Sequence, residues 1–198
     1  MNIRSRITLT VVSLSLLLLY LVPLWSIRLQ APQYPEGLGM KISLHTIVGR
    51  SPHDLQSING LNHYIGMKPI TPDAIPELRW MPWIVAFLVG FGLLAAVVGR
   101  RGLLYAWAGS FIAVALAGLY DFWRWTYDYG HNLSPNAIIK IPGMAYQPPL
   151  LGTKQLLNFT ATSLPDVGGI IAFVAVAAGV TMTVLELRET GALRLVKG

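Results

Sequence analysis

The stretch "MPWIVAFLVGFGLLAAVVGRRGLLYAWAGSFIAVALAGLY" (81–120) joins two uncharged segments through a single pair of arginines. Each segment, 81–99 and 102–120, approaches the roughly 20 apolar residues that an α-helix needs to cross the hydrocarbon core of a bilayer. Because only Arg100 and Arg101 separate them, the second helix must turn back beside the first. The stretch therefore predicts a transmembrane helical hairpin.

Two further uncharged stretches, 7–27 and 167–185, are also long enough to cross a bilayer. The chain is 54% hydrophobic and only 12% charged, whereas soluble domains carry roughly 25% charged residues. Arg4 and Arg6 precede the first stretch, as in a secretory signal peptide. Its apolar run is longer than that of a signal peptide, however, and no A-x-A cleavage site follows, so we expect an uncleaved anchor. The predicted fold class is a membrane protein with four transmembrane α-helices.

The distribution of basic residues predicts the orientation of these helices. Lysine and arginine concentrate in the short segments on the cytoplasmic side of a membrane protein. We therefore expect both termini and the Arg-Arg turn in the cytoplasm, and the two long loops outside. The net charge of +6 is then a topology signal and not a nucleic-acid footprint, so membrane lipid is an expected partner and nucleic acid is not. The residues that carry the signal are Arg4, Arg6, Arg100, Arg101, Arg188, Arg194 and Lys197.

The chain accordingly divides into an anchor helix (1–27), an outer loop (28–80), a helical hairpin (81–120), a second outer loop (121–166) and a fourth helix with its tail (167–198). We expect the two outer loops to form one mixed α/β extracytoplasmic domain. Alternation of apolar and polar residues, or β-rich composition, predicts strands. A short helix is expected after Ser51 and Pro52, which suit the N-cap and first helical positions. The predicted strands are "MKISLHTIVG" (40–49), "NAIIKI" (136–141) and "LLNFTATS" (156–163).

The third helix is predicted to continue past the membrane surface through "YDFWRWTYDYG" (120–130). Asp121, Arg124 and Asp128 follow each other at i, i+3 and i+7, so the arginine can reach either carboxylate along one helix face. One interpretation is a salt-bridged helix end with an aromatic collar. The alternative is a quinone- or partner-binding surface, for which we predict Trp123, Tyr127 and Tyr129.

The four predicted spans contain no Asp, Glu, Lys, Arg or His. This argues against a pump or an ion-coupled transporter, and it leaves no histidine ligands for a b-type haem within the spans. The absence of cysteine excludes disulfides and cysteine-ligated iron–sulfur clusters. Small residues in "GFGLLAAVVG" (90–99) and "AAGVTMT" (177–183) predict close helix packing. Neither G-x-S-x-G nor a phosphate-binding loop occurs, so we predict no catalytic residues and do not expect an enzyme.

Every histidine lies in the outer loops, together with three methionines that each follow a glycine. Imidazole and thioether groups without thiolates favour copper, and thioether especially suits Cu(I). In "LNHYIGMKPI" (61–70), His63 and Met67 are four residues apart and would share one face of a helix. The alternative is a turn that packs against 128–152 and forms a docking surface for a partner. The full set of candidate ligands is His45, His53, His63, His131, Met40, Met67 and Met144.

Three stretches, "LNHYIGMKPI" (61–70), "YDYGHNLSPNAIIKIPGMAYQPPLLG" (127–152) and "LLNFTATSLPDVGG" (156–169), resemble small membrane proteins of bacterial nitrous-oxide-reductase (nos) gene clusters. The resemblance covers most of the chain. It implies an accessory protein in the bacterial inner membrane, with its functional face in the periplasm. Its implied role is to handle copper for a periplasmic copper enzyme, or to anchor that enzyme.

The resemblance also implies which residues and partners to expect. The metal ligands that it implies are His63, Met67, His131 and Met144, with His45, His53 and Met40 as weaker candidates. The implied protein partner is the copper enzyme or its maturation machinery. The methionine-rich motif of the soluble copper chaperone from these clusters is absent here. The alternative function is a structural or assembly subunit of a respiratory membrane complex, with no metal of its own.

Overall fold

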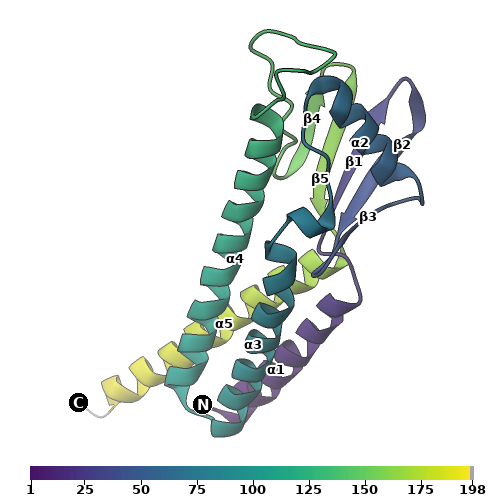
Figure 1. The fold of residues 1–198 in the computed structure, drawn as a ribbon. Helices are drawn as coiled ribbons and strands as arrows, with labels where there is room; N and C mark the ends of the chain where they lie inside the picture. Colours follow the sequence, from purple (N-terminus) through teal and green to yellow (C-terminus); the bar gives the residue numbers. More distant parts are fainter. Residues whose placement is uncertain (197–198) are drawn as a thin grey trace.

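The computed structural model describes residues 1–196 and contains four helices that are long and apolar enough to cross a membrane. The first combines α1 (Ile3–Ser15) with the 3-10 helix η1 (Leu16–Tyr20), and the others are α3 (Glu77–Val98), α4 (Arg101–His131) and α5 (Val167–Val196). They form a bundle beneath a sheet, and α4 continues beyond the bundle alongside that sheet (Figure 1). Long apolar helices are thus present where the four spans were predicted, although the first is shorter than expected, and the third continues through 120–130 as predicted. Lys197, used above for orientation, lies outside the described residues.

Glycines let the helices of the bundle approach closely, as the small-residue stretches predicted. A methyl group added at Gly92 of α3 would overlap the Oγ atom of Ser13 on α1, and one added at Gly179 of α5 would lie 2.9 Å from the Trp107 ring. Trp107 is fully buried, and its indole Nε1 donates to the carbonyl oxygen of Leu88 at 2.9 Å. The hydrogen bond satisfies the one polar atom of this side chain inside an apolar core.

Charged side chains close the end of the bundle that lies away from the sheet. Arg6 donates from Nε to the carbonyl oxygen of Ala96 and from a terminal nitrogen to that of Val97, both at 2.8 Å, and so caps the last turn of α3. Glu186 is fully buried; it accepts from the Asn2 backbone N–H at 2.9 Å and pairs with Arg101 at 2.6 Å. The predicted fourth span ended just before this carboxylate, which therefore belongs to the packed bundle.

The sheet has five antiparallel strands in the order β3-β2-β1-β5-β4. The strands are β1 (Trp25–Ala31), β2 (Tyr34–Ile42), β3 (Ile47–Gly49), β4 (Gly152–Leu156) and β5 (Phe159–Pro165). The central pair, β1 and β5, joins the two loops that precede and follow the helical hairpin. The strands, α2 (Asp54–Ile65), the 3-10 helix η2 (Pro72–Ala74) and their connections are called the sheet domain below.

One face of the sheet carries the core of the sheet domain. Trp25 and Ile27 on β1 are buried with Met40 on β2, while Arg28 points to the other face and is exposed. Ile58 of α2 and Tyr129 of α4 pack into the same apolar cluster. Alternation along the strands therefore gives a sheet with a buried side, which α2 and the extension of α4 cover.

A buried aspartate fixes α2 to the sheet. Asp54, the first residue of the helix, accepts hydrogen bonds from the backbone N–H groups of Gly39 at 2.9 Å and Ser51 at 3.2 Å. The predicted helix therefore exists but begins three residues beyond Ser51. Ser51 contributes its backbone N–H to this contact, not a side-chain cap.

Two predicted strands are wrong in extent. Residues 40–49 do not form one strand, because β2 ends at Ile42 and β3 begins at Ile47 after a turn closed by the Ser43 N–H and the Thr46 carbonyl. The segment 156–163 contains a hairpin turn after Leu156, and its second part belongs to β5. In each case the alternation continues across a turn and hides it.

Two further predictions differ from the structure. The segment 136–141 forms no strand, and Ile138 is 65% exposed. Its backbone is hydrogen-bonded to α2 through the Ile139 N–H, which donates to Tyr64 O at 2.9 Å. The helical part of the first span ends at Tyr20, and Trp25 already opens β1. Pro23 lies between them, where it cannot continue a regular helix.

Candidate functional site

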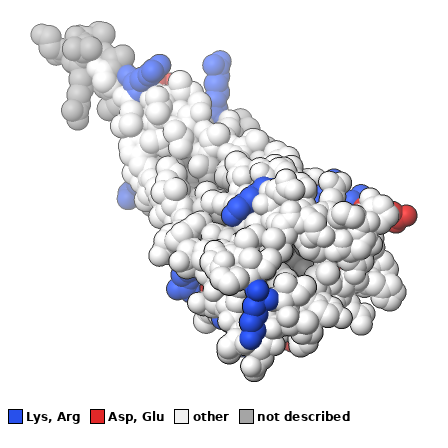
Figure 2. All heavy atoms as spheres, turned by 90° about the horizontal axis from the view of Figure 1, so that it is seen from above, with Lys and Arg blue, Asp and Glu red and all other residues white. Residues whose placement is uncertain are grey.

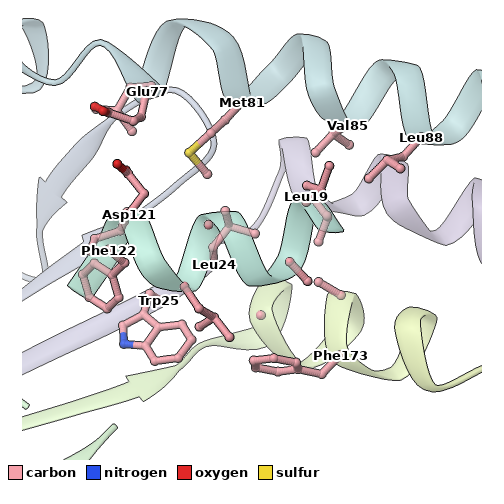
Figure 3. A pocket seen from close by; sticks show the side chains of 18 of the residues that line it. Leu19, Leu24, Trp25, Glu77, Met81, Val85, Leu88, Asp121, Phe122 and Phe173 are labelled. Carbon is pink, nitrogen blue, oxygen red and sulfur yellow. The ribbon is translucent and has the colours of Figure 1, made fainter. Parts of the chain in front are cut away.

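A cavity of about 270 Å³ lies at the junction between the bundle and the sheet domain. Its wall is formed by helices α3, α4 and α5, by the 3-10 helix η1, and by strands β1, β2 and β3 (Figure 3). We call it the junction cavity. Its wall is apolar apart from Glu77 and Asp121. The apolar lining includes Leu16, Leu19, Leu24, Trp25, Ile75, Met81, Val85, Leu88, Phe111, Leu119, Phe122, Trp125, Ala172 and Phe173.

The two carboxylates lie at one end of the junction cavity. Glu77 is the first residue of α3 and Asp121 lies on α4, and the Asp121 side chain points toward Glu77 (Figure 3). Arg124, which is largely exposed, pairs with Asp121 at 3.8 Å. Among the described residues no basic side chain comes within salt-bridge distance of Glu77. This end of the cavity therefore offers hydrogen-bond acceptors and negative charge.

Aromatic rings line the wall near these carboxylates. Trp25 makes edge contacts with Phe122 at a centroid distance of 5.5 Å and with Phe173 at 6.5 Å. The indole Nε1 of Trp25 donates to Ser163 Oγ of β5 at 2.8 Å, which satisfies its polar atom within the sheet. The cavity thus combines an apolar interior with two acceptors at one end, an arrangement that suits an amphiphilic molecule.

The residues of the junction cavity were not predicted as a site. Trp25 resembles an interfacial membrane anchor, and Glu77 and Asp121 appear in the sequence as scattered acidic residues. The quinone- or partner-binding interpretation pointed to the same part of α4, but to residues on another face of this helix. Phe122 and Trp125 line the cavity, whereas Trp123 and Tyr127 do not.

The helix ends between His63 and Met67, so these residues do not share a helix face as predicted. Gly66 follows the last residue of α2 in a left-handed conformation (φ 78°), and the Met67 N–H donates to Asn62 O at 2.9 Å. His63 is exposed, while Met67 is half-buried and packs against the core of the sheet domain. Gly66, which precedes Met67, thus terminates the helix.

The turn at Gly66 packs against the segment that follows α4, as the docking-surface alternative predicted. Gly66 O accepts from the Ser134 N–H at 2.7 Å, and an added methyl group at Gly66 would lie 2.8 Å from Ala137 Cβ. The Tyr64 carbonyl accepts from the Ile139 N–H at 2.9 Å. Two stretches that carry the family resemblance therefore form one corner of the sheet domain.

The other predicted ligands are spread over the sheet domain and its connection to α4. His45 and His53 are exposed, Met40 is buried in the core, and Met144 is half-buried. His131, at the end of α4, stacks on Tyr127 at a centroid distance of 3.9 Å, with Nδ1 3.0 Å from the Tyr127 carbonyl oxygen. Within the described part of the chain, no three His, Asp or Glu side chains gather as a metal site.

The predicted partner-binding aromatics divide between surface and core. Trp123 and Tyr127 are exposed on α4, and their rings lie 5.4 Å apart in a row that Tyr120 and His131 extend. Tyr129 is buried in the sheet-domain core, so it cannot present its ring to a partner. Of the two carboxylates that Arg124 was expected to reach, it pairs with Asp121, while Asp128 pairs with Lys68 at 2.7 Å.

The comparisons with protein-family models and with curated proteins give no match to this chain.

Proposed function

We propose that the protein is a membrane-anchored binding subunit whose junction cavity holds the hydrocarbon chain of an amphiphile. The head group of this molecule carries a hydroxyl or an ammonium group. The observation that carries the proposal is the pair Glu77 and Asp121. Among the described residues that line the cavity, these two alone are charged, and Asp121 points toward Glu77 from the neighbouring helix (Figure 3). Two carboxylates accept hydrogen bonds and attract positive charge, and they repel an anionic head.

The energetics of the two parts of the cavity favour this division of roles. Each methylene group that leaves water contributes about 0.8 kcal/mol. A hydrogen bond to a charged acceptor contributes about 1.5–3 kcal/mol, or roughly a 10- to 150-fold change in affinity. The apolar wall therefore supplies affinity for the chain, and the carboxylates select the head group.

The placement of the bundle in a bacterial inner membrane, with both termini cytoplasmic and the sheet domain periplasmic, is part of this proposal. The basic residues at the end away from the sheet support it. Trp80 and Trp83 of α3 and Tyr120 of α4 are also 64–72% exposed near the junction, as expected for side chains at a membrane interface. In this frame the junction cavity lies at the level of the outer leaflet.

Binding of three probes with the same chain and different heads tests the proposal. The protein, reconstituted in lipid nanodiscs, would be titrated with octadecylamine, octadecanol and octadecanoate, and bound probe would be counted by native mass spectrometry. We expect the amine to bind most tightly, the alcohol more weakly, and the carboxylate least. Equal binding of all three, or preference for octadecanoate, would overturn the role of the carboxylates.

Charge-removing variants locate the binding site. Glu77→Gln and Asp121→Asn should each weaken amine binding about tenfold or more, because each removes a charged acceptor. Their effect on the alcohol should be smaller. Asp73→Asn is the matched control, since Asp73 is an exposed carboxylate of η2 outside the cavity wall. If Asp73→Asn lowers amine affinity as much as the other two, the probe binds elsewhere.

A copper-related accessory role, as the family resemblance implies, is the second candidate. The packing of the turn at Gly66 against the segment after α4 favours it, because this packing gathers two of the resembling stretches into one corner. Binding by both His63 and Met67 requires the methionine to turn out of the core. The test is Cu(I) binding by the purified protein, with the His63→Ala/Met67→Ala double variant and His45→Ala as control. Binding that survives in the double variant would eliminate this site.

A further inference from the structure

A second cavity, of about 330 Å³, lies inside the sheet domain. We call it the domain cavity. Its wall comes from the buried face of β1 and β2, from α2, from the end of α4, and from the β4–β5 hairpin. Ile27, Met40 and Ile58 are among its apolar lining residues, and none of the residues in its wall is charged.

The two cavities follow one another along the same elements. On β1, Trp25 lines the junction cavity, and Ile27 and Leu29 line the domain cavity. On α4, Phe122 lines the first, and Thr126 and Tyr129 line the second. Both series run in the same direction, away from the bundle. The domain cavity therefore continues the line of the junction cavity between α4 and the sheet.

Trp125 is the one residue that contributes to the walls of both cavities. Its ring stacks between Phe122, at a centroid distance of 6.1 Å, and Tyr129, at 4.6 Å. The indole Nε1 is buried beside the Tyr129 hydroxyl, but it completes no hydrogen bond of good geometry with a described residue. A rotation of this ring would exchange its contacts with Phe122 and Tyr129 and move the indole Nε1 away from the Tyr129 hydroxyl.

The far end of the domain cavity reaches the surface through a rim where exposed apolar side chains lie beside the polar side chains of Gln33 and Asn158. Tyr64, Ile139 and Leu157 line the cavity, and each is also exposed. In the view from above, most of the surface is uncharged, and the basic and the few acidic side chains are scattered over it (Figure 2). A surface with so few charges suits the passage of an apolar group better than that of a charged one.

Leu157 occupies its place on the rim in an unfavourable backbone conformation. Its φ is 56°, and it is the one described non-glycine residue with a positive φ. Bulky side chains rarely adopt this conformation, which Asn or Gly would tolerate in the turn between β4 and β5. Residues held in such conformations concentrate at ligand-binding sites, where the side chain has a role that offsets the strain.

We infer that the two cavities are successive parts of one path for a hydrocarbon chain, which Trp125 divides and which ends at the rim of Tyr64, Ile139 and Leu157. This inference rests on the proposed function, because it extends the binding site for the same amphiphile. The volumes agree with it: at about 270 and 330 Å³ the cavities lie just below and just above the lower bound of ligand sites, which span roughly 300–1,000 Å³. Joined, they would enclose more of the chain than the junction cavity encloses alone.

Photolabelling with octadecylamine that carries a diazirine at the chain terminus tests the inference. The intact protein in nanodiscs would be irradiated, digested and mapped by mass spectrometry. A chain that points into the bundle labels peptides around Leu88 and Phe111, and a chain that has passed Trp125 labels peptides around Ile58 and Met67. We expect both sets of peptides in the wild type, and a several-fold increase in the second set for Trp125→Ala, with Trp125→Phe between them.

A rim variant keeps the test independent of core folding. Leu157→Asn removes an exposed side chain and suits the left-handed turn, so it should preserve or raise thermal stability. If the rim serves only structure, labelling will not change; if the rim holds the chain, domain-cavity labelling will fall several-fold while bundle labelling persists. Thr160→Asn, on the neighbouring strand and outside both cavity walls, is the control.

The outcomes separate the two proposals. Absence of specific labelling in both regions overturns the proposed function, and the inference with it. Bundle labelling with no domain-cavity labelling, in the wild type and in Trp125→Ala alike, overturns the inference and leaves the proposed function standing. Domain-cavity labelling that is unaffected by Trp125→Ala and by Leu157→Asn overturns the roles assigned to the partition and the rim.

Discussion

Substitution of Gly66 by alanine should destabilise the protein through two separable effects. The backbone of Gly66 has a φ of 78°, and L-residues in this conformation cost about 1–2 kcal/mol. The added methyl group would also lie 2.8 Å from Ala137 Cβ and 3.0 Å from the Ser134 nitrogen. Contacts this short force neighbouring groups apart, at about 1–3 kcal/mol. Together we expect a loss of about 2–5 kcal/mol in the free energy of unfolding.

The same helix provides a control of opposite sign. Gly60 lies inside α2, is exposed, and has nothing within 4 Å of an added methyl group. Gly60→Ala should therefore stabilise the protein by about 0.5–1 kcal/mol through improved helix propensity. Ala137→Gly combined with Gly66→Ala removes part of the steric contact and leaves the backbone cost. The double variant should fall between Gly66→Ala and the wild type.

Thermal unfolding in detergent measures these differences. A loss of 2–5 kcal/mol corresponds to a Tm lower by about 5–15 °C for a chain of this size. Hydrogen exchange at the amides of Ser134 and Ile139, which donate to Gly66 O and Tyr64 O, reports the local contact. Two results would refute the packing of the turn against the segment after α4. One is a Tm of Gly66→Ala equal to that of Gly60→Ala. The other is hydrogen exchange at those two amides that is as slow in Gly66→Ala as in the wild type.

Three further substitutions test the packing of the bundle and the sheet domain. Gly92→Ala should lower the free energy of unfolding, measured by thermal unfolding, by about 1–3 kcal/mol because the added methyl group overlaps Ser13 Oγ. Adding Ser13→Ala to this variant should restore part of the loss. Gly90→Ala, which has open space around it, should cost little. Glu186→Gln should cost about 1–3 kcal/mol by the same assay because it weakens the pair with Arg101, and an equal loss in the exposed control Glu189→Gln would contradict this. Asp54→Ala should cost about 1–3 kcal/mol because it leaves the buried Gly39 N–H without its acceptor, whereas Asp54→Asn should retain most of the stability; equal losses would show that the hydrogen bond is unimportant.

The membrane helices could be predicted from the sequence because their signal is local. An uncharged run of about 20 residues identifies a span wherever the rest of the chain goes. The boundary at the first helix was missed for the same reason, because hydropathy stays high from Leu16 through Pro23 to Trp25. Only the proline signals the change from helix to strand, and one residue is a weak signal within an apolar run.

The end of α2 could have been predicted from the sequence, but the metal hypothesis treated His63 and Met67 as residues of one helix. A glycine after a helical stretch, here Gly66 after Ile65, is the usual C-terminal cap in a left-handed conformation. Applied strictly, this rule places Met67 beyond the helix and separates it from His63. Whether either residue binds copper stays a prediction.

The junction cavity could not be predicted from the sequence. Glu77 and Asp121 are far apart along the chain and meet only because α3 and α4 are held side by side at the height of the sheet. Phe122 and Trp123 are neighbours in an aromatic run, and tertiary packing alone decides that the first lines the cavity and the second faces outward. Phe122, Trp125 and Tyr129 share one face of α4 at the spacing i, i+3 and i+7, but the spacing alone does not say that this face lines a cavity.

The pairing of β1 with β5 has a consequence for biogenesis. Trp25 and Ser163, which are hydrogen-bonded across this pair, lie 138 residues apart in the sequence. During synthesis the ribosome must deliver α3 and α4 to the membrane before β5 exists, and the inner edge of β1 stays without its partner throughout. An unpaired strand edge invites association with other chains. Translation speed and chaperones that cover this strand edge should therefore influence the yield of folded protein.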